Sequence, residues 1–205
     1  CEYAIVGNSN NKKSICFILL LCFISHNQMA FSQRFINEFP DFQNEFYKDA
    51  IALDSNFYTA TFGVNPKLIC LNKTGSIVKK TDLSNVFSKI YCLIKYDNKF
   101  YLGGYKGTEI SKKSVLLVLS KEGEIISIKN YELSYISSIF IHNADIFLGG
   151  NFDSPGSKSS AGLIKTDFTG DVNWSKKYQD YSNSQVSKIT EINDELFLLI
   201  YGTTV

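Results

Sequence analysis

The segment Leu163–Val172 (LIKTDFTGDV) recurs twice upstream in a looser form, and this repetition decides the fold. The earlier copies are Leu116–Ile125 (LLVLSKEGEI) and Leu68–Ile77 (LICLNKTGSI). The glycine in each copy lies 48 and then 47 residues from the next one. A period of this length indicates a supersecondary unit repeated in tandem.

A second motif follows nearly the same period and shows what the unit contains. Phe100–Gly104 (FYLGG) recurs as Ile146–Gly150 (IFLGG), and weaker copies are Phe57–Ala60 (FYTA) and Leu196–Leu199 (LFLL). Three of these copies follow an alternating apolar run and a polar pair. The pairs are Asp97-Asn98, Asn143-Ala144 and Asn193-Asp194. Asn and Asp tolerate the left-handed backbone of tight hairpins, so each pair predicts a turn between two strands.

One complete unit is predicted to contain four antiparallel strands. They are Ile90–Tyr96, Lys99–Gly103, Val115–Ser120 and Glu124–Tyr131, with Glu122-Gly123 as the last turn. Short apolar runs rich in Ile, Val, Phe and Tyr favour strands over helices. Four such strands in each repeat are typical of a β-propeller blade.

The sequence therefore predicts an all-β chain, a partial β-propeller of about three and a half blades. The propeller domain is expected to span residues 33–205, and its blades about 46–88, 89–134, 135–182 and, as a partial blade, 183–205. Because propellers usually close with four to eight blades, we expect the chain to be a piece of a longer protein.

The N-terminal 32 residues have the features of a secretory signal peptide. Lys12-Lys13 precede an apolar run, Ile15–Ile24, and the small residues of Ala30–Ser32 suit cleavage after Ser32. A run of this length is too short to span a bilayer. We therefore expect a signal-peptide helix and a protein that is secreted or held at the cell surface, with no membrane span after cleavage. The alternative is a buried first strand or helix.

Two further features of the N-terminus bear on its processing. Cys22 suggests lipid attachment, but the preceding Leu21 is larger than a lipoprotein cleavage site accepts. The chain begins with Cys1 rather than Met, so either the start is mis-assigned or the sequence is a fragment.

The composition suits an exported β-protein and argues against nucleic-acid binding. Without residues 1–32, 19 Lys and Arg residues balance 19 Asp and Glu residues, which leaves no excess of basic side chains for phosphates. Hydrophobic residues make up 44% of the chain and aromatic residues 14%, which is ample material for a core.

The cysteines and histidines predict no metal site or catalytic centre. Cys70 and Cys92 occupy repeat positions that take small side chains elsewhere, and a disulfide between them remains an alternative. His26 lies in the leader, and His142 is expected to be a surface residue beside a turn. No histidine pair, Cys-x-x-Cys or Gly-x-Ser-x-Gly motif occurs, so we assign no catalytic, cofactor or metal residue.

The remaining motifs receive structural interpretations. Gly103-Gly104 and Gly149-Gly150 end strands and begin no helix, so they predict close backbone approach rather than phosphate binding. Asp153–Ser160 reads as a solvated loop, with ligand contact as the alternative. Two glycosylation sequons begin at Asn72 and Asn173.

Two families resemble parts of this chain. The FYLGG and LLVLSKEGEI motifs resemble the secreted propeller repeats of Bacteroidota, including delta-60-type repeats, over about residues 46–205. Thr166–Trp174 (TDFTGDVNW) is similar to the tryptophan docking motif of pyrroloquinoline-quinone propellers, a similarity that implies a quinone cofactor. It is confined to one repeat, because the others have Lys80 and Ile128 near the position of the tryptophan.

The leading hypothesis is an exported, non-enzymatic propeller that binds an unidentified protein or glycan, or acts as a scaffold, at the cell exterior. The alternative is a piece of a quinoprotein-like or other propeller enzyme whose catalytic residues lie outside this chain. A purely structural stalk is a third interpretation.

Overall fold

The structure is a computed structural model that describes residues 16–19, 34–37, 46–62, 65–153, 158–178, 182–193 and 195–203. Every regular element in this part of the chain is a strand, as predicted. Of the expected signal peptide, only Cys16–Leu19 is described. It forms strand β1, paired antiparallel with β2 (Arg34–Asn37), so these four residues are extended rather than helical. The rest of that segment, with the cleavage point after Ser32, lies outside the described residues.

Three four-stranded antiparallel sheets and one two-stranded sheet follow, each with its strands in chain order. The first sheet contains β3 (Phe46–Leu53), β4 (Asn56–Phe62), β5 (Lys67–Leu71) and β6 (Ile77–Asp82). The second contains β7 (Lys89–Tyr96), β8 (Lys99–Thr108), β9 (Ser111–Ser120) and β10 (Ile125–Tyr131). The third contains β11 (Tyr135–His142), β12 (Asp145–Phe152), β13 (Ser160–Thr166) and β14 (Val172–Tyr178). The fourth contains β15 (Ser182–Ile192) and β16 (Glu195–Thr203).

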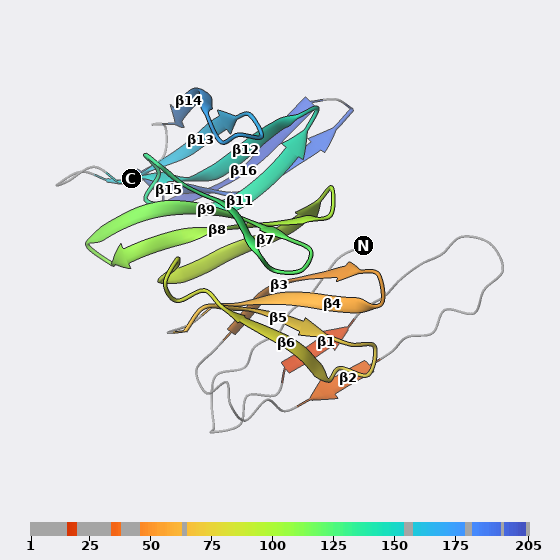
Figure 1. The fold of residues 1–205 in the computed structure, drawn as a ribbon. Helices are drawn as coiled ribbons and strands as arrows, with labels where there is room; N and C mark the ends of the chain where they lie inside the picture. The colour runs from red at the N-terminus through yellow and green to blue at the C-terminus, as the bar shows by residue number, and fades with distance from the viewer. Residues whose placement is uncertain are drawn as a thin grey trace.

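The first three sheets follow one another in chain order, from the orange and yellow first sheet through the green second to the teal third (Figure 1). The fourth sheet packs on the third through β15. A separate apolar cluster fills each of the three interfaces. One joins Leu68 to Leu117, the next joins Tyr101 to Ile136, and the third joins Phe147 to Val186. Each core thus lies between two sheets rather than within one, which is how propeller blades pack.

The hairpin turns have the backbone that the polar pairs predicted. Asp97 and Asn98 have φ of 46° and 55°, and Asn143 and Ala144 have φ of 47° and 70°. Two successive positive φ values define the turn whose twist matches that of antiparallel strands. The predicted hairpins between the first and second strands of the repeats are therefore confirmed.

The first motif recurs because one turn between the third and fourth strands is built three times. In the third sheet, Asp167 Oδ1 accepts hydrogen bonds from the backbone N of Thr169, at 2.9 Å, and of Asp171, at 3.0 Å. Asn72 and Ser120 have the same role in the earlier sheets. The glycine in each turn has a φ of 80° to 85°, which a residue with a side chain rarely adopts.

One connection differs from the expectation. The second and third strands of the second sheet were predicted to end at Gly103 and begin at Val115, but they extend to Thr108 and begin at Ser111. Of the added residues, Tyr105 and Ser114 are buried and those nearest the turn are polar and mostly exposed, and the backbones stay paired up to Thr108↔Ser111. Gly107 permits the turn with a φ of 117°.

Candidate functional site

Three tyrosines meet where the first strands of the second and third sheets begin, and we call them the tyrosine cluster. The ring of Tyr91 lies 4.9 Å from that of Tyr135 and 6.0 Å from that of Tyr105, measured between centroids. Tyr91 lies at a bulge in β7, where the register with β8 shifts between Ile90 and Cys92. A bulge redirects a side chain out of the regular alternation, and here it places an aromatic ring between two sheets.

A lysine covers two rings of the tyrosine cluster. Lys112 Nζ lies 5.3 Å from the ring centroid of Tyr105 and 5.8 Å from that of Tyr135, within the range of a cation–π contact. Glu109 holds this lysine at 2.8 Å and also accepts from Lys89, at 2.8 Å, and from the Tyr105 hydroxyl, at 2.7 Å. The cluster is therefore held in place before any ligand arrives.

The same contacts set the protonation of the site. Hydrogen bonds from Lys112, Lys89 and Tyr105 lower the pKa of Glu109 to about 2. Burial raises the pKa of Tyr91 and of Tyr135 to about 12 each, with the neighbouring tyrosines adding to the shift. Near neutral pH the phenols keep their protons. Tyr105 and Tyr135 donate theirs to Glu109 and Gln185, so each of these two oxygens remains an acceptor beside an aromatic face.

The tyrosine cluster continues toward the fourth sheet through polar side chains. The Tyr135 hydroxyl donates to Gln185 Oε1 on β15. Asn151, the cross-strand partner of Tyr135, is 6% exposed and donates from Nδ2 to Asp153 at 3.1 Å. Its Oδ1 has no hydrogen-bond partner among the described residues, so one buried acceptor is unsatisfied beside the cluster.

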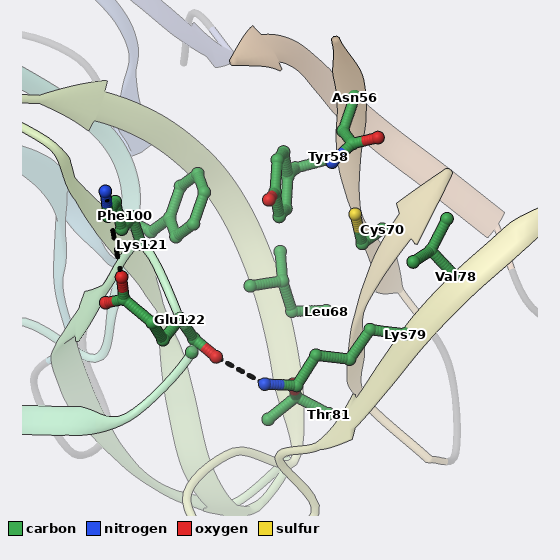
Figure 2. Close-up of a pocket in the computed structure, with 11 residues that line it drawn as sticks. Asn56, Tyr58, Leu68, Cys70, Val78, Lys79, Thr81, Phe100, Lys121 and Glu122 are labelled. Carbon is green, nitrogen blue, oxygen red and sulfur yellow. Dashed lines mark hydrogen bonds and ion pairs between the residues drawn. The ribbon is translucent and has the colours of Figure 1, made fainter. Parts of the chain in front are cut away.

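A pocket of about 290 Å³ lies between the first sheet and the β9–β10 turn (Figure 2). Tyr58, Leu68 and Cys70 line it from the first sheet, and Phe100 faces Tyr58 across it with ring centroids 4.5 Å apart. Burial, and then a hydrogen bond with the Cys70 thiol, raise the pKa of Tyr58.

The rim of this pocket is charged. Lys79 donates to the backbone oxygen of Glu122, and Lys121 lies 3.8 Å from the Glu122 carboxylate. An apolar floor with a charged rim suits a small amphipathic molecule.

The predicted cysteine and histidine positions have the following outcomes. Cys70 and Cys92 are both buried free thiols, so the alternative of a disulfide between them is wrong. His142 ends β11 beside a turn, as predicted, but it is not alone, because its Nδ1 lies 2.7 Å from Glu191 Oε2 on β15. These two residues are 49 positions apart, and only the stacking of the third and fourth sheets joins them.

The predicted close backbone approach is confirmed at Gly104 and Gly150, but both glycine pairs lie within β8 and β12 rather than at strand ends, and Gly103 and Gly149 face side chains of the next sheet. A Cβ added to Gly104 would lie 3.0 Å from the Cα of Ile90, and one added to Gly103 would lie 2.6 Å from Ile136 Cγ2. Of the predicted loop Asp153–Ser160, residues 154–157 lie outside the described residues.

The residues of the quinone-like motif have local structural roles. Asp167 organises its own turn, and hydrogen bonds from Thr169 and Asp171 lower the pKa of its carboxyl. Trp174 lies on β14, is 41% exposed, and packs edge-on against Phe147 with ring centroids 6.2 Å apart.

The described part of the chain groups no three His, Cys, Asp or Glu side chains as metal ligands. No helix in these same residues is long and apolar enough to cross a membrane.

The tyrosine cluster and Lys112 were not predicted from the sequence. Tyr91 and Tyr135 both lie near the start of a first strand, but they occupy different positions of the repeat. A periodicity search therefore does not pair them, and their proximity depends on the bulge in β7.

No family model and no curated protein matches this chain. Among solved structures, it is similar to the Pan2 WD40 domain of Neurospora crassa, with 11% identity and a TM-score of 0.49 over 97% of this chain and 61% of that one. It is also similar to BamB from Moraxella catarrhalis, with 13% identity and a TM-score of 0.41 over 92% of this chain and 64% of that one. A protein of unknown function from Bacteroides caccae has 11% identity and a TM-score of 0.33, over 81% and 78% of the two chains. The chain thus spans about three fifths of the Pan2 domain.

Proposed function

We propose that this chain is an exported, non-enzymatic β-propeller that binds an extracellular protein or glycan, with the tyrosine cluster as its contact surface. The observation that supports this most is the placement of Lys112 over two tyrosine rings at the end of rigid, stacked sheets. Aromatic faces beside fixed donors and acceptors are common in binding surfaces, because little side-chain entropy is lost when a ligand is bound.

Preorganisation supports a binding role for the tyrosine cluster. Glu109 anchors Lys112, and Gln185 anchors Tyr135, so the rings and the cation already have defined positions.

Titration calorimetry of the full chain tests the proposal. The probes are soluble glucan, mannan and N-acetylglucosamine oligosaccharides and a set of unstructured peptides. We expect at least one probe to bind, and Tyr91→Ala and Tyr135→Ala each to weaken it more than tenfold. Tyr96→Ala is the matched control, because Tyr96 lies at the other end of β7 and is 40% exposed. A probe that binds all four proteins equally, or no binding by any probe, would contradict the proposal.

Export is a separate part of the proposal and rests on the N-terminal sequence pattern. The pattern of Lys12-Lys13, the apolar run and Ala30–Ser32 supports it. We expect the chain, expressed in a bacterial host, to leave the cytoplasm with Gln33 as its first residue. Fractionation followed by mass measurement tests this, and an uncleaved cytoplasmic chain would contradict it.

The enzymatic alternative is a piece of a quinoprotein-like propeller. The support for it is the Thr166–Trp174 motif, whose tryptophan packs on the chain's own Phe147. Quenching of Trp174 fluorescence by added pyrroloquinoline quinone would favour this alternative over a binding module.

A further inference from the structure

Each of the three interfaces between sheets contains an equivalent pair of residues, which we call the contact pair. It consists of a small residue on the second strand and its cross-strand neighbour on the first strand of the same sheet. The small residues are Ala60, Gly103 and Gly149, and each faces the first strand of the next sheet. A Cβ added to Gly149 would lie 2.6 Å from Val186 Cγ1, as one added to Gly103 would from Ile136 Cγ2. Real Cβ atoms do not approach so closely, so a large side chain here would push the next sheet away.

The other member of the contact pair contacts the backbone of the first strand in the next sheet. Ser138 Oγ accepts from the backbone N of Ile189 at 3.0 Å, and Asp49 Oδ2 accepts from that of Leu93 at 3.3 Å. Cys92, at the same repeat position, donates its thiol hydrogen to the Ile136 carbonyl at 3.9 Å. The two N–H groups follow the bulges of β7 and β15, where the ladder is irregular and an outside partner is needed.

The fourth sheet has neither the small residue nor the hydrogen-bonding residue of the contact pair. Its contact pair is Lys188 and Leu199, which are cross-strand partners at the positions of Ser138 and Gly149. Leu199 is 64% exposed and has a long side chain where the second and third sheets have glycine. Lys188 offers no acceptor for a backbone N–H. The outer face of β15–β16 is therefore not built to receive another sheet of this repeat in the same geometry.

This face is nevertheless largely apolar and carries two opposite charges, Lys188 and Glu195. The side chains that alternate along the two strands away from the third sheet are Lys188, Thr190, Ile192, Glu195, Phe197, Leu199 and Tyr201. Phe197 is 43% exposed and Tyr201 67%, whereas Phe147, at the position of Phe197 in the third sheet, is 5% exposed. Exposed apolar side chains gathered on one face indicate an interaction surface.

We propose that two copies of this chain associate through this face, around a two-fold axis that crosses the strands near Phe197. Leu199, opposite Lys188, lies four residues along β16 from Glu195, about 13 Å in an extended strand, with Phe197 midway. A two-fold rotation about an axis through Phe197 exchanges the ends of the face, so Lys188 of each copy lies near Glu195 of the other. Self-complementarity of this kind is what an interface between two identical subunits requires.

Sedimentation equilibrium of the full chain over a range of concentrations tests the proposal. We expect a concentration-dependent dimer in the unmodified chain. Lys188→Glu and Glu195→Lys should each weaken association more than tenfold, because like charges then face one another. The double variant Lys188→Glu/Glu195→Lys should restore it. Lys73→Glu, in an exposed turn of the first sheet, is the control for a change of net charge.

Each alternative outcome overturns the proposal. These outcomes are a monomer at all concentrations, an association that neither single reversal changes, and a loss that the double variant does not repair. Circular dichroism of each variant establishes that the sheets are intact, which we expect since both positions are exposed. The tyrosine cluster lies outside this face, so ligand binding and dimerisation can fail independently.

Discussion

The outer faces of the third and fourth sheets are formed by equivalent strands but carry different side chains at two equivalent positions. On the third sheet, Gly149 and Ser138 admit β15, and Phe147 is 5% exposed beneath it. On the fourth sheet, Leu199 and Lys188 replace this pair, and Phe197 is 43% exposed. Strand pattern alone therefore does not determine which sheets stack. Two small residues on each interface decide how closely the next sheet can approach.

Truncation of the equivalent phenylalanines should give the largest difference between the two faces. We expect Phe147→Ala to lower the free energy of unfolding by about 3–5 kcal/mol, because it leaves a cavity between the third and fourth sheets. Phe197→Ala should cost less than about 1 kcal/mol, since its side chain is already partly in water. Urea denaturation measures both. Equal losses would show that the two faces are covered to the same extent.

Exchange of the small residue should give the next largest effect. Gly149→Leu places a side chain against Val186, and we expect a loss of about 1–3 kcal/mol from overpacking. Leu199→Gly is the converse change and should cost no more than about 1 kcal/mol. The midpoint of urea unfolding reports each value. Full stability of Gly149→Leu would mean that the sheets tolerate a wider separation than the structure shows.

Removal of the acceptor should have a similar or smaller effect. Ser138→Ala leaves the backbone N–H of Ile189 unpaired in the interface, which we expect to cost about 1–3 kcal/mol. Lys188→Ala, the matched change on the fourth sheet, should be within about 0.5 kcal/mol of the unmodified chain. Hydrogen exchange of the Ile189 amide gives an independent measurement, and exchange should be faster in Ser138→Ala only.

The smallest effect should come from the ion pairs beside the tyrosine cluster, which bridge no apolar interface. The pKa of Glu109 is lowered from 4.5 to about 2 in the folded chain, so its contribution to stability is present above pH 4.5 and is lost as the pH falls toward 2. Its side chain is 63% exposed, so solvent screening limits this contribution to about 0.5 kcal/mol. The loss of stability between pH 6 and pH 2.5 should therefore be slightly smaller in Glu109→Gln. An identical pH dependence in both proteins would contradict the ion-pair geometry.

Much of the fold follows from local patterns. The predicted strand Ile90–Tyr96 is β7 within one residue, and Glu124–Tyr131 is β10 within one residue. The turns followed from Asn, Asp and Gly at fixed offsets, because these residues favour a positive φ whatever their surroundings. The end of the hairpin between β8 and β9 was missed because the residues from Lys106 to Lys113 are mostly polar and have no strand periodicity.

The candidate site could not be predicted from local sequence patterns. Tyr91 and Tyr135 meet because a bulge turns one ring toward the next sheet, and Lys112 reaches Tyr135 from the hairpin of β8 and β9. His142 meets Glu191 in the same way, across two sheets. Such contacts join residues some 20 to 50 positions apart, and nothing in the neighbouring sequence encodes them.

By itself, the amino-acid sequence determined the repeat, the strands and the turns, because backbone preference and alternating hydrophobicity act over a few residues. The change from glycine to Leu199 was visible in the sequence as a weaker copy of a motif. Only the tertiary structure showed that this position faces the next sheet, since the space beside a residue depends on what packs against it. Stacking, the tyrosine cluster and the outer face of β15–β16 were therefore decided by packing between sheets.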